Sequence, residues 1–488
     1  GFSEGSMLVG QFFLIASSLY AMFAALRDDR RVLMVSMIFA SFAVFNTFNV
    51  AIRLNNLLVD FLLPALALAA IAGCFVYRNR FWFLSLNTAV ILGLLSIVKV
   101  SGFFFVALVL VVYVVCIVRL LVRKRARLKA LVLLIMTLLV SCLPFVIWQK
   151  HVTDNFPNAS SAKHAVSMSE LGQVLTGNLS GVPQKIITLF VKSVFTFDSL
   201  ASNGILIINL IMLIAFIVIG IRLKYKKFVL LTWGFVDISI VTYYIGILLM
   251  YLTAMPTDEA LELAGFERYA SSIVIFAFGC LTMALAWVMD KGLYEKIISK
   301  RNARSYKSLF NKRLYQYASL VLTVYAIGMF LSENNGIVYN NNQETNEVAK
   351  EIRQFTGSQS NSSTDRILVV TADKENVDNY FAQYASRYYL WDVNVDAREN
   401  FVSVDQKFLD LMASYSDSAT SYYLSNKNID TRDNSNLTDD DFIALLKTYD
   451  EVLILDDHYT FNTLTKKLFG RTYSPGLYKV SDILAGKG

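Results

Sequence analysis

The chain has 488 residues, of which 55% are hydrophobic and only 17% are charged, and its formal net charge is +7. Soluble globular proteins average about 25% charged residues, whereas the apolar residues here gather in blocks of roughly 20 that end near Leu331. A bilayer core about 30 Å thick needs about 20 apolar helical residues, so this composition excludes an ordinary soluble protein. The basic excess lies between the blocks and does not indicate nucleic-acid binding.

Ten membrane-spanning helices are predicted within residues 1–332, the first of two predicted domains. They are expected at about residues 7–26, 32–51, 57–76, 81–98, 102–122, 130–148, 204–221, 228–254, 269–289 and 315–332. With ten spans, all the basic clusters fall on one side, which the positive-inside rule identifies as the cytoplasm. The clusters are Arg27–Arg31, Arg78–Arg80, Arg119–Lys129, Arg222–Lys227 and Lys291–Arg313.

The longest connection on the opposite, external side is predicted to be residues 149–203. Within it, apolar residues recur at helical spacing over Val182–Phe195. Such a helix could lie along the outer membrane interface, or it could pack against the helical bundle. The sequence leaves these two alternatives equally open.

Residues 333–488 are predicted to form a soluble domain outside the cell, with a net charge of −9 against +16 for the rest of the chain. Alternating strand and helix patterns predict a small α/β fold with a largely parallel sheet. Strands are expected at 366–371, 389–395, 452–455 and 477–480, and helices at 344–355, 376–388, 408–414 and 440–449. All four cysteines precede this domain, so no disulfide stabilises it, which favours a Gram-positive surface over a eukaryotic lumen.

Ionisable side chains gather near the external ends of the predicted spans. Each has an ordinary explanation: Lys99 and Arg268 could be snorkelling anchors, and Asp60 could be a helix-end polar group. Together, however, they would form a cationic patch beside carboxylates at the outer leaflet, which suits a lipid-linked phosphate. The residues are Asp60, Lys99, Lys163, His164, Glu259, Glu262, Glu267 and Arg268.

Motifs of several common enzyme classes are missing from the sequence. There is no Walker A, HExxH, GxSxG or GxGxxG pattern, and only three histidines occur. An ATPase, a zincin or a serine hydrolase is therefore disfavoured. The sequence names no cofactor and leaves a role for a divalent metal open.

Five stretches, taken in their order along the chain, resemble the GT-C superfamily of polytopic glycosyltransferases, in particular the bacterial cell-surface polysaccharide type. No single stretch is specific, and their order is the stronger signal. They are VDFLLP around Asp60, VKVSGFFF around Lys99, AKHAVS with Lys163 and His164, ALELAGFERYASS with Glu267, Arg268 and Tyr269, and the C-terminal TYDEVLILDDHYTFNTLTKKLFGRTYSPGLYKV.

The resemblance implies a multi-pass enzyme of the bacterial plasma membrane. A sugar carried on a polyprenyl phosphate would be transferred to a surface glycan or glycolipid, usually with inversion. An acidic residue of the first external loop would act as general base, and cations would stabilise the leaving phosphate. The implied phosphate ligands are Arg268, Lys99, and Lys163 or His164, with Asp60, Glu267 and Tyr269 as further substrate-binding residues.

The catalytic base departs from the family pattern. The resemblance places the family's first span and first external loop ahead of Gly1, so one further span is expected there. Glu4 is the only nearby acid. The base is thus either Glu4 or a residue that precedes this sequence.

Two other functions compete with the transferase. A transporter or flippase for lipid-linked saccharide would share the hydrophobicity and the cationic patch, but it would often show an internal repeat, and none is visible. A non-catalytic scaffold would use its external domain to bind a partner. Replacing Arg268 would not impair the function of such a scaffold.

Overall fold

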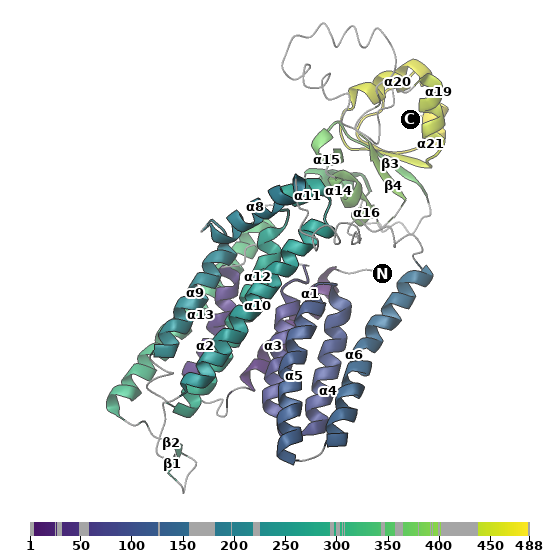
Figure 1. Ribbon diagram of the computed structural model, residues 1–488. Coiled ribbons are helices and arrows are strands. Elements are labelled where there is room, and N and C mark those ends of the chain that lie inside the picture. Colours follow the sequence, from purple (N-terminus) through teal and green to yellow (C-terminus); the bar gives the residue numbers. More distant parts are fainter. Residues whose placement is uncertain are drawn as a thin grey trace. The chain divides into compact units, whose positions relative to one another are not determined.

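The computed structural model describes most of the chain as two compact units, residues 1–340 and 341–488 (Figure 1). The described residues are 4–24, 26, 32–47, 58–124, 127–155, 181–196, 198–217, 225–292, 297–298, 303–304, 306, 308–342, 347–356, 365–378, 380–390, 392, 394–398, 401 and 438–486. The predicted domain boundary after residue 332 falls inside a helix that continues to Asn342.

In its described residues the first unit is helical, apart from one short antiparallel pair of strands, β1 (Ile297–Ile298) and β2 (Ala303–Arg304). Its helices are α1 (Glu4–Phe23), α2 (Val32–Thr47), α3 (Leu62–Tyr77), α4 (Phe81–Val98), α5 (Gly102–Lys124), α6 (Arg127–Asn155), α8 (Val182–Phe195), α9 (Leu200–Ala215), α10 (Lys226–Thr253), α11 (Thr257–Leu261), α12 (Phe266–Gly292) and α13 (Leu309–Asn342).

Among the described residues, seven helices are long and apolar enough to cross a membrane, or eight if the bent pair α8 and α9 forms one span. Helices α2 and α3 are apolar but shorter. Each of the ten predicted spans overlaps one of these helices, and the count of ten stays a prediction. The chain is therefore a helical, multi-pass membrane protein.

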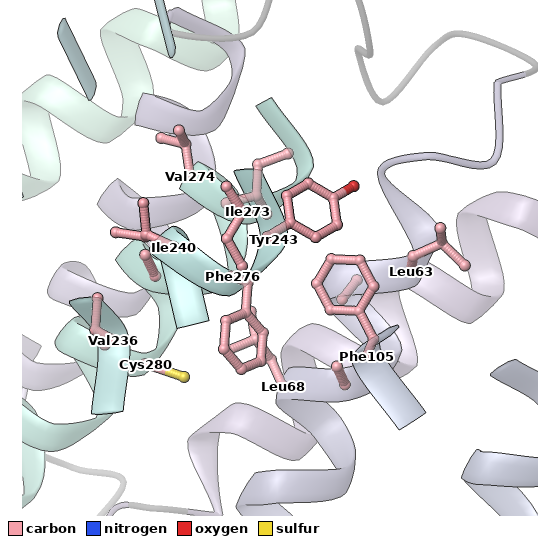
Figure 2. Packing of buried hydrophobic residues seen from close by; sticks show 14 of the residues in the cluster. Leu63, Leu68, Phe105, Val236, Ile240, Tyr243, Ile273, Val274, Phe276 and Cys280 are labelled. Atoms are coloured by element: carbon pink, nitrogen blue, oxygen red, sulfur yellow. The ribbon is translucent and has the colours of Figure 1, made fainter. Parts of the chain in front are cut away.

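Helix α12 is the centre of the first unit. In its apolar segment 83% of the residues are buried, against at most 50% in the other six long apolar helices. It packs against α2, α3, α9 and α10. Figure 2 shows the rings of Phe105 from α5, Tyr243 from α10 and Phe276 from α12 close together, and the centroid of the Phe105 ring lies 5.7 Å from each of the other two.

The predicted helix over Val182–Phe195 is confirmed as α8 with the same bounds. Its Ile186 and Phe190 are buried, and the Phe190 ring lies 5.6 Å from that of Phe266 in α12. One face of α8 therefore packs against the bundle, while Val191 and Phe195 stay exposed.

The contact between α3 and α12 is too close for a side chain at Gly279. A Cβ at this position would clash with Leu68 of α3, lying 2.8 Å from its Cδ2 atom, and Leu68 is fully buried. We expect Gly279→Val to lower the free energy of unfolding by about 1–3 kcal/mol, because overpacking a close-packed core forces side chains and backbone apart. The midpoint of thermal unfolding in detergent measures this.

The matched control is Gly246→Val in α10, where nothing lies within 4 Å of an added Cβ. This variant makes the same change in helix propensity in a neighbouring helix, but without the clash. Equal losses in both variants would contradict a tight α3–α12 contact.

The second unit contains a four-stranded sheet in the order β4-β3-β5-β6. Strand β3 is parallel to β4 and β5, and β6 is antiparallel to β5. The strands are β3 (Ile367–Val370), β4 (Val395–Arg398), β5 (Glu451–Ile454) and β6 (Gly476–Lys479), and the helices are α14 (Glu347–Thr356), α15 (Lys374–Asp378), α16 (Phe381–Leu390), α19 (Asp439–Leu446), α20 (Tyr459–Phe469) and α21 (Val480–Leu484).

Strand β3, one of the two interior strands of this sheet, is buried on both faces, as its continuous apolar run predicts. Leu368 and Val370 join a cluster that includes Phe442 and Phe461, whereas Ile367 and Val369 join a second cluster. Helices α19 and α20 thus contribute to the core on one side of the sheet.

Two predicted elements of this unit are wrong in detail. The strand expected over 389–395 begins only at Val395, because α16 continues through Leu390, which is fully buried and follows Ala382 at helical spacing. The helix expected over 376–388 is broken at Tyr380, whose φ of 62° is left-handed. The helix expected over 408–414 lies outside the described residues.

Candidate functional site

A buried carboxylate, Asp60, lies just before α3 and holds two cations from other helices. The Lys99 Nζ atom donates to its Oδ1 at 2.7 Å, and Arg268 donates to its Oδ2 through Nη2 at 2.7 Å and Nε at 2.8 Å. Asp60 is 2% exposed, while the side chains of Lys99 and Arg268 are 27% and 32% exposed. Both carboxylate oxygens are therefore occupied, and the two cations still reach the surface.

Local structure brings these residues together at the ends of their helices. Lys99 directly follows α4 in an extended conformation, and its carbonyl accepts a hydrogen bond from Gly102, where α5 begins. The Ser272 hydroxyl of α12 donates to the Asp60 carbonyl at 3.3 Å. Helices α3, α4 and α12 thus all contribute to one cluster, although Asp60 and Arg268 are 208 residues apart.

Tyr251 of α10 holds the loop that leads into α12. This side chain is 1% exposed, and its hydroxyl donates to the carbonyls of Leu263 at 3.1 Å and Ala264 at 2.9 Å. Those two hydrogen bonds hold the turn just before Phe266, so Arg268 in the first turns of α12 has a defined position.

Tyr269 lies beside both cations. The Lys99 Nζ atom is 5.2 Å from the centre of its ring, and the Arg268 Cζ atom is 5.9 Å away. An aromatic face within about 6 Å attracts a cation. Tyr269 therefore helps hold two like charges close together, which Asp60 alone would do less well.

Glu267 is adjacent in sequence but has a different partner. Its Oε2 atom accepts a hydrogen bond from the backbone N–H of Ala201 at 3.2 Å, in the first turn of α9. A carboxylate at a helix N-terminus satisfies an orphan donor and complements the helix dipole. Glu267 thus ties α9 to α12.

The cluster of Asp60, Lys99, Arg268 and Tyr269, called here the cation clamp, carries one net positive charge. A guanidinium has five N–H donors and an ammonium has three, and the clamp uses two and one of them on Asp60. The other donors belong to half-buried cations, in a setting that strengthens hydrogen bonds to an anion. Donors of this kind are those that phosphate groups use in proteins.

Only some of the remaining predicted site residues belong to the part of the chain that the structure describes. Lys163 and His164 lie outside the described residues, and Glu4 is the first residue of α1, with a side chain that is also outside them. Glu259 lies on α11, and Glu262 is exposed just after it. In the part of the chain that the structure describes, no group of three His, Cys, Asp or Glu residues could hold a metal ion.

Sequence reasoning missed Tyr251 and Ser272. Both lie within apolar helices, where a serine is usually bonded to the backbone of its own helix and a tyrosine usually packs as a large aromatic side chain. The signal for Ser272 is its place one turn after Arg268, on the helix face that carries the clamp.

Comparison of the sequence with models of protein families gives no match. Comparison with curated proteins gives no match either, and none is found among solved structures. The resemblance to polytopic glycosyltransferases therefore depends only on the quoted stretches.

Proposed function

We propose that the chain is a glycosyltransferase of the bacterial plasma membrane. It would move a sugar from a polyprenyl-phosphate donor to a cell-surface glycan or glycolipid at the outer leaflet, with the C-terminal unit outside the cell. The observation that carries the proposal is the cation clamp, a partly exposed positive site at the ends of apolar helices. Such a place suits a ligand with a phosphate head and a hydrocarbon tail.

In this proposal Lys99 and Arg268 bind the donor phosphate, and Asp60 is a positioning residue because both its oxygens hold these cations. The acceptor hydroxyl attacks the anomeric carbon of the sugar, and the bond from that carbon to the phosphate oxygen breaks. The phosphate leaves with the bonding electron pair, and a carboxylate takes the proton of the hydroxyl. Cations at the leaving oxygen lower the barrier, since negative charge develops there.

The general base is proposed to be Glu4 or an acid that precedes this sequence, and Lys163 or His164 is a further phosphate ligand. Glu267 supports the site through its hydrogen bond to α9. Tyr269 contacts the cations and completes the wall beside the phosphate.

The test is the composition of surface polysaccharide from a strain that lacks the gene, together with its lipid-linked sugars. The transferase predicts loss of one sugar while the polysaccharide backbone stays intact, and accumulation of the polyprenyl-phosphate sugar at the outer leaflet. A flippase predicts accumulation at the inner leaflet instead. An unchanged polysaccharide would exclude both the transferase and the flippase, and the non-catalytic scaffold would be the remaining function.

A further inference from the structure

A concave site lies within the C-terminal unit, between the end of α20 and β6. Its volume is about 410 Å³, within the range of small-ligand sites, which is roughly 300–1,000 Å³. The side chains that line it are Lys466, Arg471, Thr472, Tyr473, Ser474 and Tyr478. We call this the basic pocket.

The walls of the basic pocket are held by internal contacts. Gly470 ends α20 in the left-handed conformation, with φ of 76°, which suits glycine. The Tyr473 backbone N–H then donates to Asn462 Oδ1 at 2.9 Å, and the Tyr478 hydroxyl donates to the Ser474 carbonyl at 3.0 Å. The connection from α20 to β6 is thus fixed at both ends, so a ligand would not have to order it.

The charge of the pocket is opposite to that of its surroundings. Residues 333–488 carry a net charge of −9, yet the pocket presents Lys466 and Arg471 and no acidic lining residue. The next residue, Lys467, pairs with Asp439 at 3.0 Å. Among the residues that the structure describes, Lys466 has no such ion pair, so its charge faces the pocket uncompensated.

Hydroxyl and aromatic groups complete the lining. The rings of Tyr473 and Tyr478 lie 5.1 Å apart in an edge-to-face arrangement, and Thr472 and Ser474 add exposed hydroxyls. Tyr473 is 3% exposed and its hydroxyl donates to the Ile483 carbonyl at 3.5 Å, so its ring supports Tyr478 from within the core. The partly exposed ring of Tyr478 beside these hydroxyls suits the apolar and polar faces of a sugar ring, and the cations suit an anionic substituent.

We propose that the basic pocket binds an anionic saccharide unit, one that carries a phosphate or a carboxylate, as a docking site for the acceptor glycan. That the ligand is an acceptor rests on the proposed transferase function, whereas binding itself does not. The pocket lies in a unit separate from the cation clamp, so the two sites can fail independently.

The experiment measures binding of glucose 6-phosphate, glucuronate, glucose and inorganic phosphate to the full chain in neutral-lipid nanodiscs at low salt. We expect the two anionic sugars to bind at least tenfold more tightly than glucose, and glucose 6-phosphate to bind more tightly than inorganic phosphate. Lys466→Ala should weaken binding of the anionic sugars about fivefold, the upper range for one exposed charge. Lys466→Ala combined with Arg471→Ala should weaken it at least tenfold.

Lys467→Ala is the matched control, since it removes the same charge from the same helix turn outside the pocket. Equal weakening by Lys466→Ala and Lys467→Ala would overturn the proposal, as would equal binding of glucose and glucose 6-phosphate. Adding phosphatidylglycerol to the nanodisc distinguishes the sources of the anion. Displacement of the sugar by this lipid would assign the pocket to a headgroup and overturn the acceptor role.

Binding of the sugars is measured without any transfer reaction. Surface polysaccharide that is unchanged in a strain lacking the gene would therefore contradict the transferase and leave binding of the sugars to the pocket intact. A chain that transfers sugar at the wild-type rate after both pocket substitutions would contradict the docking role alone.

Discussion

Replacing Arg268 by alanine is expected to lower the rate of sugar transfer about 100-fold to 1,000-fold. Arg268 supplies two of the three hydrogen bonds that Asp60 accepts in the clamp, and its other N–H groups are the proposed ligands of the leaving phosphate. Removing one donor that stabilises developing charge costs about this much in other enzymes. The measurement is transfer of labelled sugar by the purified protein, together with surface polysaccharide composition in cells.

Two further variants make this result specific. Arg268→Lys keeps the charge but loses the planar, bidentate donor geometry of the guanidinium. We expect the rate of sugar transfer to fall about tenfold. Arg80→Ala is the matched control, because Arg80 also lies over an aromatic ring, 5.7 Å from that of Phe83, but at the opposite end of α4 from Lys99. It should transfer sugar within about twofold of the wild type. Full activity of Arg268→Ala would favour the non-catalytic scaffold.

Replacing Asp60 by alanine is expected to destabilise the fold as well as abolish transfer. The two cations would be left close together without their shared carboxylate, and removing one partner of a buried ion pair costs about 3–5 kcal/mol. Because Lys99 and Arg268 are about a third exposed, water compensates part of this. We expect a loss of about 1–3 kcal/mol, seen as a lower midpoint of thermal unfolding in detergent.

A double substitution separates the charge effect from a packing effect. Asp60→Ala with Lys99→Ala removes one of the two unpaired cations. The double variant should therefore lose about 0.5–3 kcal/mol less stability than the two single variants lose together. Glu262→Ala replaces an exposed acidic residue just after α11. It should leave stability unchanged. Strict additivity of the two single variants would show that the carboxylate does not hold the cations together.

The grouping of the clamp residues could be predicted from the sequence because it depends only on topology. Asp60, Lys99 and Arg268 lie at predicted span ends on one side of the membrane, and the positive-inside rule needs no side-chain geometry. Which carboxylate pairs with which cation could not be predicted, since that depends on how α3, α4 and α12 pack. Ser272 and Tyr251 could not be found, because a buried hydroxyl in an apolar helix has no distinct pattern.

In the second unit, prediction succeeded where burial alone decides the structure. The run from Ile367 to Val370 is apolar throughout and forms the interior strand β3. Prediction failed at Tyr389, a residue with strand preference, because α16 continues through Leu390, which packs into the core. Tertiary contacts outweigh such local preference, which amounts to only about 1 kcal/mol.

The sequence separations within the clamp also set an order of events during synthesis. Lys99 follows Asp60 by 39 residues and Arg268 follows it by 208. At about 5–20 residues per second, Lys99 emerges from the ribosome roughly 2–8 seconds after Asp60, and Arg268 only after roughly 10–40 seconds. The carboxylate thus gains a nearby counterion early in membrane insertion. The anion site itself is completed only when α12 arrives, so a partly translated chain cannot hold a donor phosphate there.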